Sequence, residues 1–331
     1  MNNLNHSSLA PELGRIKSVA NSLESRLIRT PTVPWPVPVA AGGPDVDLFI
    51  KLELLQRTGS FKARGALNTV AHLIKNADST EFPGITAFSA GNHAIAAAFA
   101  AKESGISAKV VMPNNADPFR MRQCEAYGAE IVLGESIADL IAIVDEIKKE
   151  EGRELVHPFE GIHTIEGTAT VGLELCEDTP ELDAVIVPVG GGGLIAGIAC
   201  AVKQMQTKCQ VIGVEPAGAN GMQQSLEKGQ PMDHVQVDTI ADSLGAPMHA
   251  PLSFSVIEKF VDDIVTVSDE QMREGMRKMY SDMKLAVEPA CAATLAALSG
   301  PLAGRFAGKR VALVACGSNI DPARYARLLG S

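Results

Sequence analysis

Short apolar segments of two kinds alternate along much of this chain, and the alternation limits the folds that it can adopt. From about residue 83, the strand-like segments ITAFSA, KVVMP and EIVL are each followed by a segment with the apolar spacing of a helix. Strands separated by helices of this length pair in parallel through right-handed crossovers. The sequence therefore predicts an α/β structure with a parallel sheet, and a compact unit at about residues 80–158.

A second alternation follows this unit. AVIVPV, QVIGVEP and RVALVACG indicate strands, and LIAGIACAVKQM and EQMREGMRKMYSDMKL indicate helices. Continuous apolar strands are typical of parallel sheets that are covered on both faces. Because 331 residues exceed the usual size of one core, the length favours two lobes or one large α/β domain. We expect a large domain of residues 1–79 and 159–331 and a small α/β domain of residues 80–158. A cleft between them would bind a ligand at the strand ends.

The N-terminal part is less regular. Residues 11–28 have the spacing of an amphipathic helix, whereas the prolines and glycines of residues 30–45, TPTVPWPVPVAAGGPD, exclude regular structure there. A strand, LFIKLE, follows and leads into the segment TGSFKARGA.

Composition excludes several classes of function. The net charge of −10 and the isoelectric point near 5.2 disfavour nucleic acids and anionic membranes, because both bind basic patches. The N-terminus lacks an apolar segment behind basic residues, and no run of about 18 apolar residues occurs. The six cysteines form no CxxC pair and no cluster with histidine, which disfavours structural zinc. We expect a cytoplasmic protein with reduced thiols.

Four consecutive glycines, Gly190 to Gly193, lie between a predicted strand and a predicted helix in VIVPVGGGGLIAG. Residues without a Cβ let backbone N–H groups converge on an anion at a helix N-terminus, where the dipole favours negative charge. The run indicates a phosphate site, with a flexible turn as the simpler alternative. A dinucleotide site is also open, because Gly191-x-Gly193-x-x-Ala196 fits the loose fingerprint and Glu215 ends the next strand.

A lysine in an unusual setting gives the second chemical signal. In TGSFKARGA, Lys62 lies between Phe61 and small residues, which give its long side chain little surface to lie against. A solvated lysine and a reactive lysine are both open on this segment alone. A phosphorylated aldehyde cofactor would explain Lys62, the SAGNH segment and the glycine run together, whereas a nucleotide would explain only the glycine run.

Seven segments between about residues 14 and 325 resemble the fold-type-II pyridoxal-phosphate enzymes, and specifically the threonine and serine dehydratases and serine racemase. In order, they are LELLQRTGSFKARGA, SAGNH, VVMPNNADPFRMRQCEAYGAEIVL, VGGGGLIAG, DTIADSLGA, MKLAVEPACAA and ACGSNID. The resemblance implies an α/β fold like that of the tryptophan synthase β subunit, with two open parallel-sheet domains. It also implies pyridoxal 5'-phosphate in the cleft between the domains, and a homodimer.

The resemblance implies roles for individual residues. Lys62 would hold the cofactor as a Schiff base and then take the α-proton of the substrate. The implied cofactor-binding residues are Phe61, Lys62, Asn92, Gly190, Gly191, Gly192, Gly193, Glu288 and Cys316. The implied substrate-binding residues are Ser89, Ala90, Gly91, Asn92, His93 and Asp242.

Three of these roles are specific. The glycines would hold the cofactor phosphate, and Asn92 would hydrogen-bond the ring hydroxyl oxygen. Cys316 would face the ring nitrogen, where a neutral thiol cannot keep the ring protonated as an aspartate would; this suits β-elimination better than transamination. For His93, a loop or capping role and a catalytic role are both open.

The chain differs from the pattern of this family at several positions. Ala90 replaces the serine that serves the racemase as a second base, so racemisation should be slight and a dehydratase is favoured. Glu215 matches the first acidic ligand of cation-binding relatives, but Gly221 replaces the second; Glu215 and Ala219 are the only weak candidates, and we expect no required metal. Ser243 replaces a glycine near the expected substrate groups.

We therefore predict a pyridoxal-phosphate-dependent dehydratase, an ammonia-lyase, that converts a β-hydroxy α-amino acid to a 2-oxo acid and ammonia. L-Threonine or L-serine is the default substrate. Dehydration of phenylserine or hydroxyaspartate, and serine racemisation, are the alternatives within the family. A nucleotide-dependent oxidoreductase is the alternative from a different class, and a catalytically silent amino-acid-binding relative is another.

Overall fold

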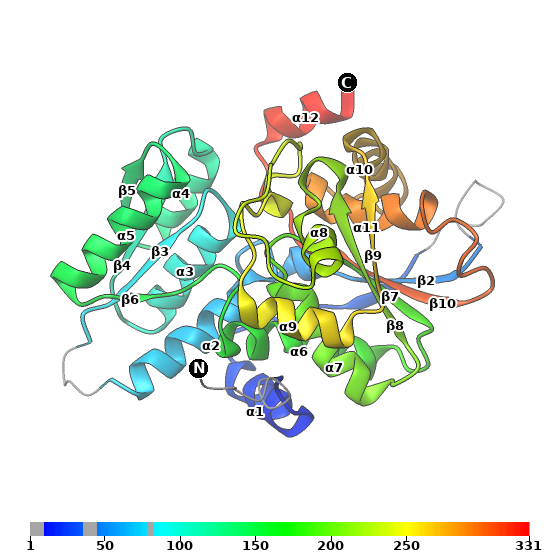
Figure 1. Ribbon diagram of the computed structural model, residues 1–331, viewed down its shortest axis with the longest axis horizontal. Helices are drawn as coiled ribbons and strands as arrows, with labels where there is room; N and C mark the ends of the chain where they lie inside the picture. Colours follow the sequence, from blue (N-terminus) through cyan, green and yellow to red (C-terminus); the bar gives the residue numbers. More distant parts are fainter. Residues whose placement is uncertain (1–9, 36–44, 78–81, 331) are drawn as a thin grey trace.

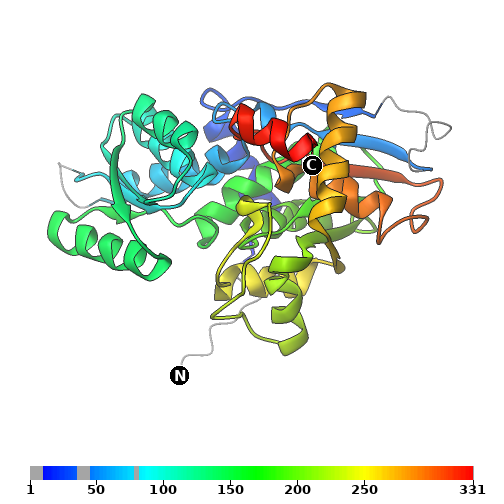
Figure 2. The same cartoon turned by 90° about the horizontal axis from the view of Figure 1, so that it is seen from above.

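The computed structural model describes residues 10–35, 45–77 and 82–330, and it contains two β-sheets surrounded by helices (Figure 1). The predicted α/β class with parallel sheets is confirmed. In the view turned by 90°, the smaller sheet again lies to one side of the larger one, so the sheets are neighbours and are not stacked face to face (Figure 2). In the described ranges, no helix is long and apolar enough to cross a membrane.

The larger sheet has six strands in the order β1-β2-β10-β7-β8-β9. Its strands are β1 (Thr32–Pro34), β2 (Asp47–Lys51), β7 (Ala184–Pro188), β8 (Gln210–Pro216), β9 (Asp263–Val267) and β10 (Arg310–Val314). All pairs are parallel except β1 with β2. The expectation of no regular structure in residues 30–45 is therefore wrong at β1, because an edge strand tolerates a proline; residues 36–44 lie outside the described residues.

The smaller sheet has four parallel strands in the order β5-β4-β3-β6. They are β3 (Ile85–Phe88), β4 (Ala108–Pro113), β5 (Glu130–Gly134) and β6 (Glu154–Leu155). The helices between these strands are α3 (Asn92–Glu103), α4 (Pro118–Ala126) and α5 (Ile137–Glu151). All of these strands fall inside residues 80–158, and that domain boundary stays a prediction.

Helices of the rest of the chain pack around the larger sheet. They are α1 (Leu13–Leu23), α2 (Lys62–Lys75), α6 (Ile162–Asp178), α7 (Gly193–Met205), α8 (Gly221–Lys228), α9 (Pro251–Phe260), α10 (Asp269–Met283), α11 (Pro289–Ser299) and α12 (Pro322–Gly330). The described residues also form the short 3₁₀ turns η3 (Glu53–Leu55), η4 (Ala217–Ala219) and η5 (Asp242–Leu244).

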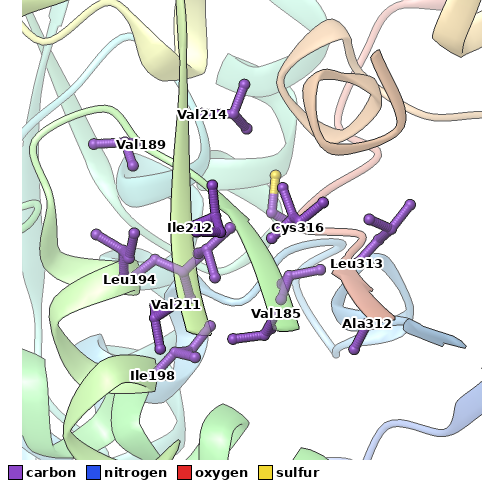
Figure 3. Packing of buried hydrophobic residues seen from close by; sticks show 14 of the residues in the cluster. Val185, Val189, Leu194, Ile198, Val211, Ile212, Val214, Ala312, Leu313 and Cys316 are labelled. Atoms are coloured by element: carbon purple, nitrogen blue, oxygen red, sulfur yellow. The ribbon is translucent and has the colours of Figure 1, made fainter. Parts of the chain in front are cut away.

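The core of the larger sheet is aliphatic. Every residue of β7 is buried, and Val185, Ile212 and Leu313 from neighbouring strands have no exposed surface. Figure 3 shows these side chains together with Leu194 at the start of α7 and with the sulfur of Cys316. Burial of each such side chain stabilises the fold by about 1.5–3 kcal/mol. The carboxyl ends of β7 and β10 are therefore held in fixed positions.

A buried cluster of charges anchors helix α2. Arg64, 1% exposed, donates to both carboxylate oxygens of Glu53 and of Glu174 at 2.7–2.8 Å, and Lys51 donates to Glu174 at 2.7 Å. Buried charges persist only where they are paired in this way. Because Lys62 is the first residue of the same helix, the cluster also fixes the position of that lysine.

Candidate active site

A cavity of about 470 Å³ lies where the two sheets meet. All the predicted cofactor- and substrate-binding residues line it. Several of them follow the carboxyl ends of strands: Ser89 follows β3, the glycine run follows β7, and Cys316 follows β10. Ligands of open parallel sheets bind at such ends.

Lys62 projects into this cavity from the start of α2. Its Nζ donates to the carbonyl oxygen of Pro158 at 2.5 Å, and part of the side chain remains accessible from the cavity. Desolvation lowers the pKa of Lys62 from 10.5 to about 8, against the opposing effects of Cys316 and Glu288. A substantial fraction of the amine is therefore neutral near pH 8, as nucleophilic attack and proton abstraction require.

The glycine run forms a cradle at the N-terminus of α7. In the described chain, the backbone N–H groups of Gly190, Gly191 and Gly192 donate to no protein oxygen. Gly192 has φ of +91°, and a Cβ on Gly191 would lie 2.2 Å from the ring of Phe159. Free N–H groups at a helix N-terminus, with no room for a Cβ, fit a phosphate group.

A second cradle is formed by Ser89 to His93 at the start of α3. The N–H of Gly91 donates to the Ser89 hydroxyl at 3.0 Å, while the N–H groups of Asn92 and His93 have no acceptor in the described chain. Ala90 is exposed to the cavity. The loop can therefore accept a carboxylate group.

His93 is a buried, neutral histidine. Its Nε2 donates to the carbonyl oxygen of Val156 at 2.7 Å. Desolvation, and then the charge of Lys62, lower the pKa of His93 to about 3. This geometry favours the structural role that the sequence left open for His93.

The side chain of Asn92 is already hydrogen-bonded to three other side chains, and its predicted bond to the cofactor ring hydroxyl would have to replace one of these bonds. Its Nδ2 donates to Glu288 at 2.8 Å and to the Ser243 hydroxyl at 3.3 Å, and its Oδ1 accepts from Asn319 at 2.7 Å. Both amide hydrogens are thus in use, so a ring hydroxyl bound by Asn92 would have to replace one of these acceptors. Desolvation raises the pKa of Glu288 to about 7, although the Arg120 cation opposes it.

Cys316 is buried at the cavity wall. The neighbouring thiol of Cys291, and then desolvation, raise the pKa of Cys316 well above its ordinary value. The thiol is therefore neutral. Cys291, which lies in α11, received no role from the sequence.

Asp242 lines the cavity but is paired with two arginines. It accepts from Arg120 at 2.6 Å and from Arg324 at 3.1 Å. Desolvation would raise the pKa of Asp242, but the two cations outweigh it and the pKa is lowered. A substrate group that binds Asp242 would therefore meet an ionised carboxylate whose charge is already balanced by Arg120 and Arg324.

Sequence reasoning missed two parts of the site. Arg120 is 3% exposed and reaches from α4 to the larger sheet, where it donates to Asn319 as well as to Asp242. Residues 156–160, VHPFE, surround Lys62 and the glycine run. A histidine before a proline at the end of a strand could have marked this turn, because the residue before proline is held extended.

The weak metal candidates lie away from the cavity. Glu215 accepts the N–H groups of Met222 and Gln223, both at 2.8 Å, and so caps α8. Desolvation raises the pKa of Glu215 to about 7. Ala219 offers no side-chain ligand, and no group of three or more potential metal-binding side chains occurs within the residues that the structure describes.

The residues present fit pyridoxal phosphate. The cavity combines an amine of lowered pKa, a phosphate cradle with unpaired N–H groups and a neutral thiol. Residues 24–317 match the family model described as "Pyridoxal-phosphate dependent enzyme".

Similar proteins are found among characterised relatives and solved structures. The chain is 49% identical to the phenylserine dehydratase of Ralstonia pickettii over 287 residues, which is 87% of each chain. It is 39% identical to the catabolic L-threonine dehydratase of Escherichia coli strain K12 over 286 residues, 86% of each chain. The structure of maize serine racemase superposes with a TM-score of 0.88 at 33% identity, over 96% of both chains.

Proposed function

The chain belongs to the family of pyridoxal-phosphate-dependent enzymes, and from this premise we propose that it removes water from a β-hydroxy α-amino acid to give a 2-oxo acid and ammonia. The observation that carries the proposal is Lys62, whose amine has a pKa of about 8 in a cavity with two anion cradles. The family match includes the glycine run, so the nucleotide-dependent alternative has no remaining support.

We assign the binding roles as follows. Lys62 would attach the cofactor, the N–H groups of the glycine run would hold its phosphate, and Cys316 would lie against its ring nitrogen. Bound there, pyridoxal phosphate supplies an electron sink that weakens the Cα–H bond of an amino acid.

The protein's own residues would then orient the substrate and move its proton. The free N–H groups of Asn92 and His93 would hold the substrate carboxylate, and Lys62 would take the α-proton at Nζ. The carbonyl of Pro158 holds that amine by a 2.5 Å hydrogen bond. Loss of the β-hydroxyl as water follows removal of the α-proton, and hydrolysis completes the reaction.

Ala90 favours elimination over racemisation. Racemisation needs a second base on the face opposite Lys62, and the methyl group of Ala90 cannot move a proton. The neighbouring Ser89 hydroxyl accepts a hydrogen bond from Gly91 within the loop. We therefore propose that racemase activity is slight.

L-Threonine and L-serine are the default substrates, and phenylserine is a second candidate with an observation in its favour. Phe88, Ile137 and Leu140 give the cavity an apolar wall, and Ile137 is 47% exposed there. An apolar wall accommodates an aromatic β-substituent better than a charged one, which disfavours hydroxyaspartate. The relative from R. pickettii is named for phenylserine.

An assay of ammonia and 2-oxo acid release from a panel of 3-hydroxy amino acids tests the function. We expect turnover of at least one of threonine, serine and phenylserine, a yellow protein, and a loss of at least about 10²-fold in Lys62→Ala. Lys203→Ala, at a partly buried ion pair with Asp262 outside the cavity, is the matched control. A colourless protein after incubation with pyridoxal phosphate, or full activity in Lys62→Ala, would refute the proposal.

We further propose a cytoplasmic homodimer in which residues 80–158 form the small domain. The six cysteines are free and buried, which suits a reducing compartment. Light scattering of the purified protein tests the dimer.

A further inference from the structure

Residues 156–160, VHPFE, form a linker segment between β6 and α6 that contacts Lys62, His93 and the glycine run. Its first residue, Val156, accepts from His93, and the carbonyl of Pro158 accepts from Lys62. Glu160 accepts the N–H groups that open α9, from Leu252 and Ser253, at 2.8 and 3.1 Å. The conformation of this short segment therefore helps to set the orientation of the Lys62 amine, whose backbone is held by the Arg64 cluster.

The linker segment also supports the phosphate cradle. Cβ atoms added to Gly191 and Gly193 would lie 2.2 Å from the ring and 2.5 Å from the carbonyl oxygen of Phe159. Phe159 thus packs directly behind the glycine run. A shift of the segment would move Lys62 and the phosphate cradle together.

One side chain holds the turn of the linker segment. The Nδ1 atom of His157 accepts two backbone N–H groups, from Phe159 at 3.3 Å and from Glu160 at 3.0 Å. Because a backbone N–H can only donate, Nδ1 must carry a lone pair, and the ring is neutral with its proton on Nε2. Protonation of Nδ1 would direct its hydrogen at the hydrogens of the two backbone N–H groups that it now accepts.

The surroundings of His157 agree with a neutral ring. Phe88 and Phe159 pack edge-on against it, with centroids at 5.7 and 4.6 Å. The titratable groups that face it from other elements are Lys62 of α2 and His93 of α3, and Glu160 lies in its own segment. Desolvation, and then the charge of Lys62, lower the pKa of His157 to about 4.

We propose that His157 is a positioning residue for cofactor binding: as a hydrogen-bond acceptor, its Nδ1 fixes the linker segment so that Pro158 aligns Lys62 and Phe159 supports the glycine run. His157 itself has no role in proton transfer. The competing explanation is that the ring merely fills space between Phe88 and Phe159.

Two substitutions distinguish the effect of the Nδ1 acceptor of His157 from the effect of its ring. His157→Asn keeps an acceptor near the place of Nδ1 but lacks the ring, whereas His157→Phe keeps the ring but lacks the acceptor. The affinity of each full-length variant for pyridoxal phosphate is measured by absorbance titration. This quantity does not depend on which amino acid the enzyme consumes. His234→Phe, at an exposed histidine outside the cavity, is the matched control.

We expect His157→Phe to lose about tenfold or more in affinity and His157→Asn to stay within about threefold of the wild type. Equal affinity of His157→Phe and the control, or equal loss in both variants, would overturn the proposal. Should a variant fail to fold, ¹⁵N NMR of the wild-type holoenzyme at a pH of about 6.5, the ordinary pKa of histidine, gives the answer. An Nε2–H tautomer supports the proposal, and an imidazolium or an Nδ1–H tautomer contradicts it.

Discussion

The chemistry of single residues in this site depends on what surrounds them. The role of Lys62 could be predicted from the sequence, because the TGSFKARGA segment around it and the glycine run further along the chain are both recognisable. The roles of Arg120 and His157 could not be predicted, because these roles depend on the groups that the two side chains contact in the fold and not on adjacent residues. Arg120 acts on Asn319, 199 positions away, and His157 acts through backbone N–H groups that no side-chain pattern displays.

The lowered pKa of Lys62 predicts how its reactivity depends on pH. The neutral amine is the nucleophile, so covalent capture of pyridoxal phosphate by the cofactor-free protein should accelerate as pH rises and level off above a midpoint of about 8. Stopped-flow absorbance measures this rate. In Glu288→Gln the midpoint should fall, because the carboxylate stabilises the ammonium form. A wild-type midpoint near 10.5, the ordinary pKa of lysine, would contradict the prediction.

Among the helices and strands, the sequence predicted those that have a recognisable N-terminal cap or a regular spacing of apolar residues. Ser136 and Ser268 cap α5 and α10 through N–H groups of the first turn, and both helices were found to within two residues. Helices α6 and α11 were missed because they are buried almost all round, which removes the alternation of apolar and polar faces. Strand β9 was missed because its burial pattern does not alternate regularly.

The turn between β7 and α7 should tolerate no added methyl group. In Gly193→Ala, the Cβ would lie 2.5 Å from the carbonyl oxygen of Phe159, so the backbone must shift. We expect a destabilisation of about 1–3 kcal/mol and a lowered affinity for pyridoxal phosphate. Urea unfolding and absorbance titration measure these effects.

Gly14→Ala is the control for that substitution. Gly14 lies in α1 with nothing within 4 Å of an added Cβ. This variant should gain about 0.5–1 kcal/mol in stability because alanine is the better helix former. An unchanged cofactor affinity in Gly193→Ala would show that the glycine run is not held against Phe159.

At the scale of the whole molecule, Arg120 joins the two sheets. It extends from α4, donates to Asn319 at 3.0 Å and to Asp242 at 2.6 Å, and lies 3.5 Å from Glu288. Sequence patterns predicted the helix α4, and the resemblance implied Asp242 and Glu288 as site residues. They could not place the two sheets relative to each other, because that arrangement depends on contacts between distant parts of the chain, such as the hydrogen bonds of Arg120 and the packing of α2 against α3.

Arg120→Met should weaken both the fold and the site. It leaves Asp242 and Glu288 without their shared cation, at a cost of about 1–3 kcal/mol in the free energy of unfolding, and it should raise the pKa of Glu288 above 7. Urea unfolding of Arg120→Met, Asp242→Asn and the double variant measures the coupling. Strictly additive effects of the two substitutions would show that the ion pair does not join the sheets.

The hydrogen bonds around Asn92 have a consequence for how the protein acquires its activity. Asn319 bonds to Asn92, 227 positions away, and to Thr58, 261 positions away, while Asn92 bonds to Glu288 across 196 positions. Such bonds close very long loops, and their entropic cost is met only after the local parts of the chain have formed. We therefore expect the site to be among the last features to assemble during folding. A nascent chain should not hold the reactive aldehyde cofactor in place until the segment around Asn319 has been synthesised and has reached Asn92 and Thr58.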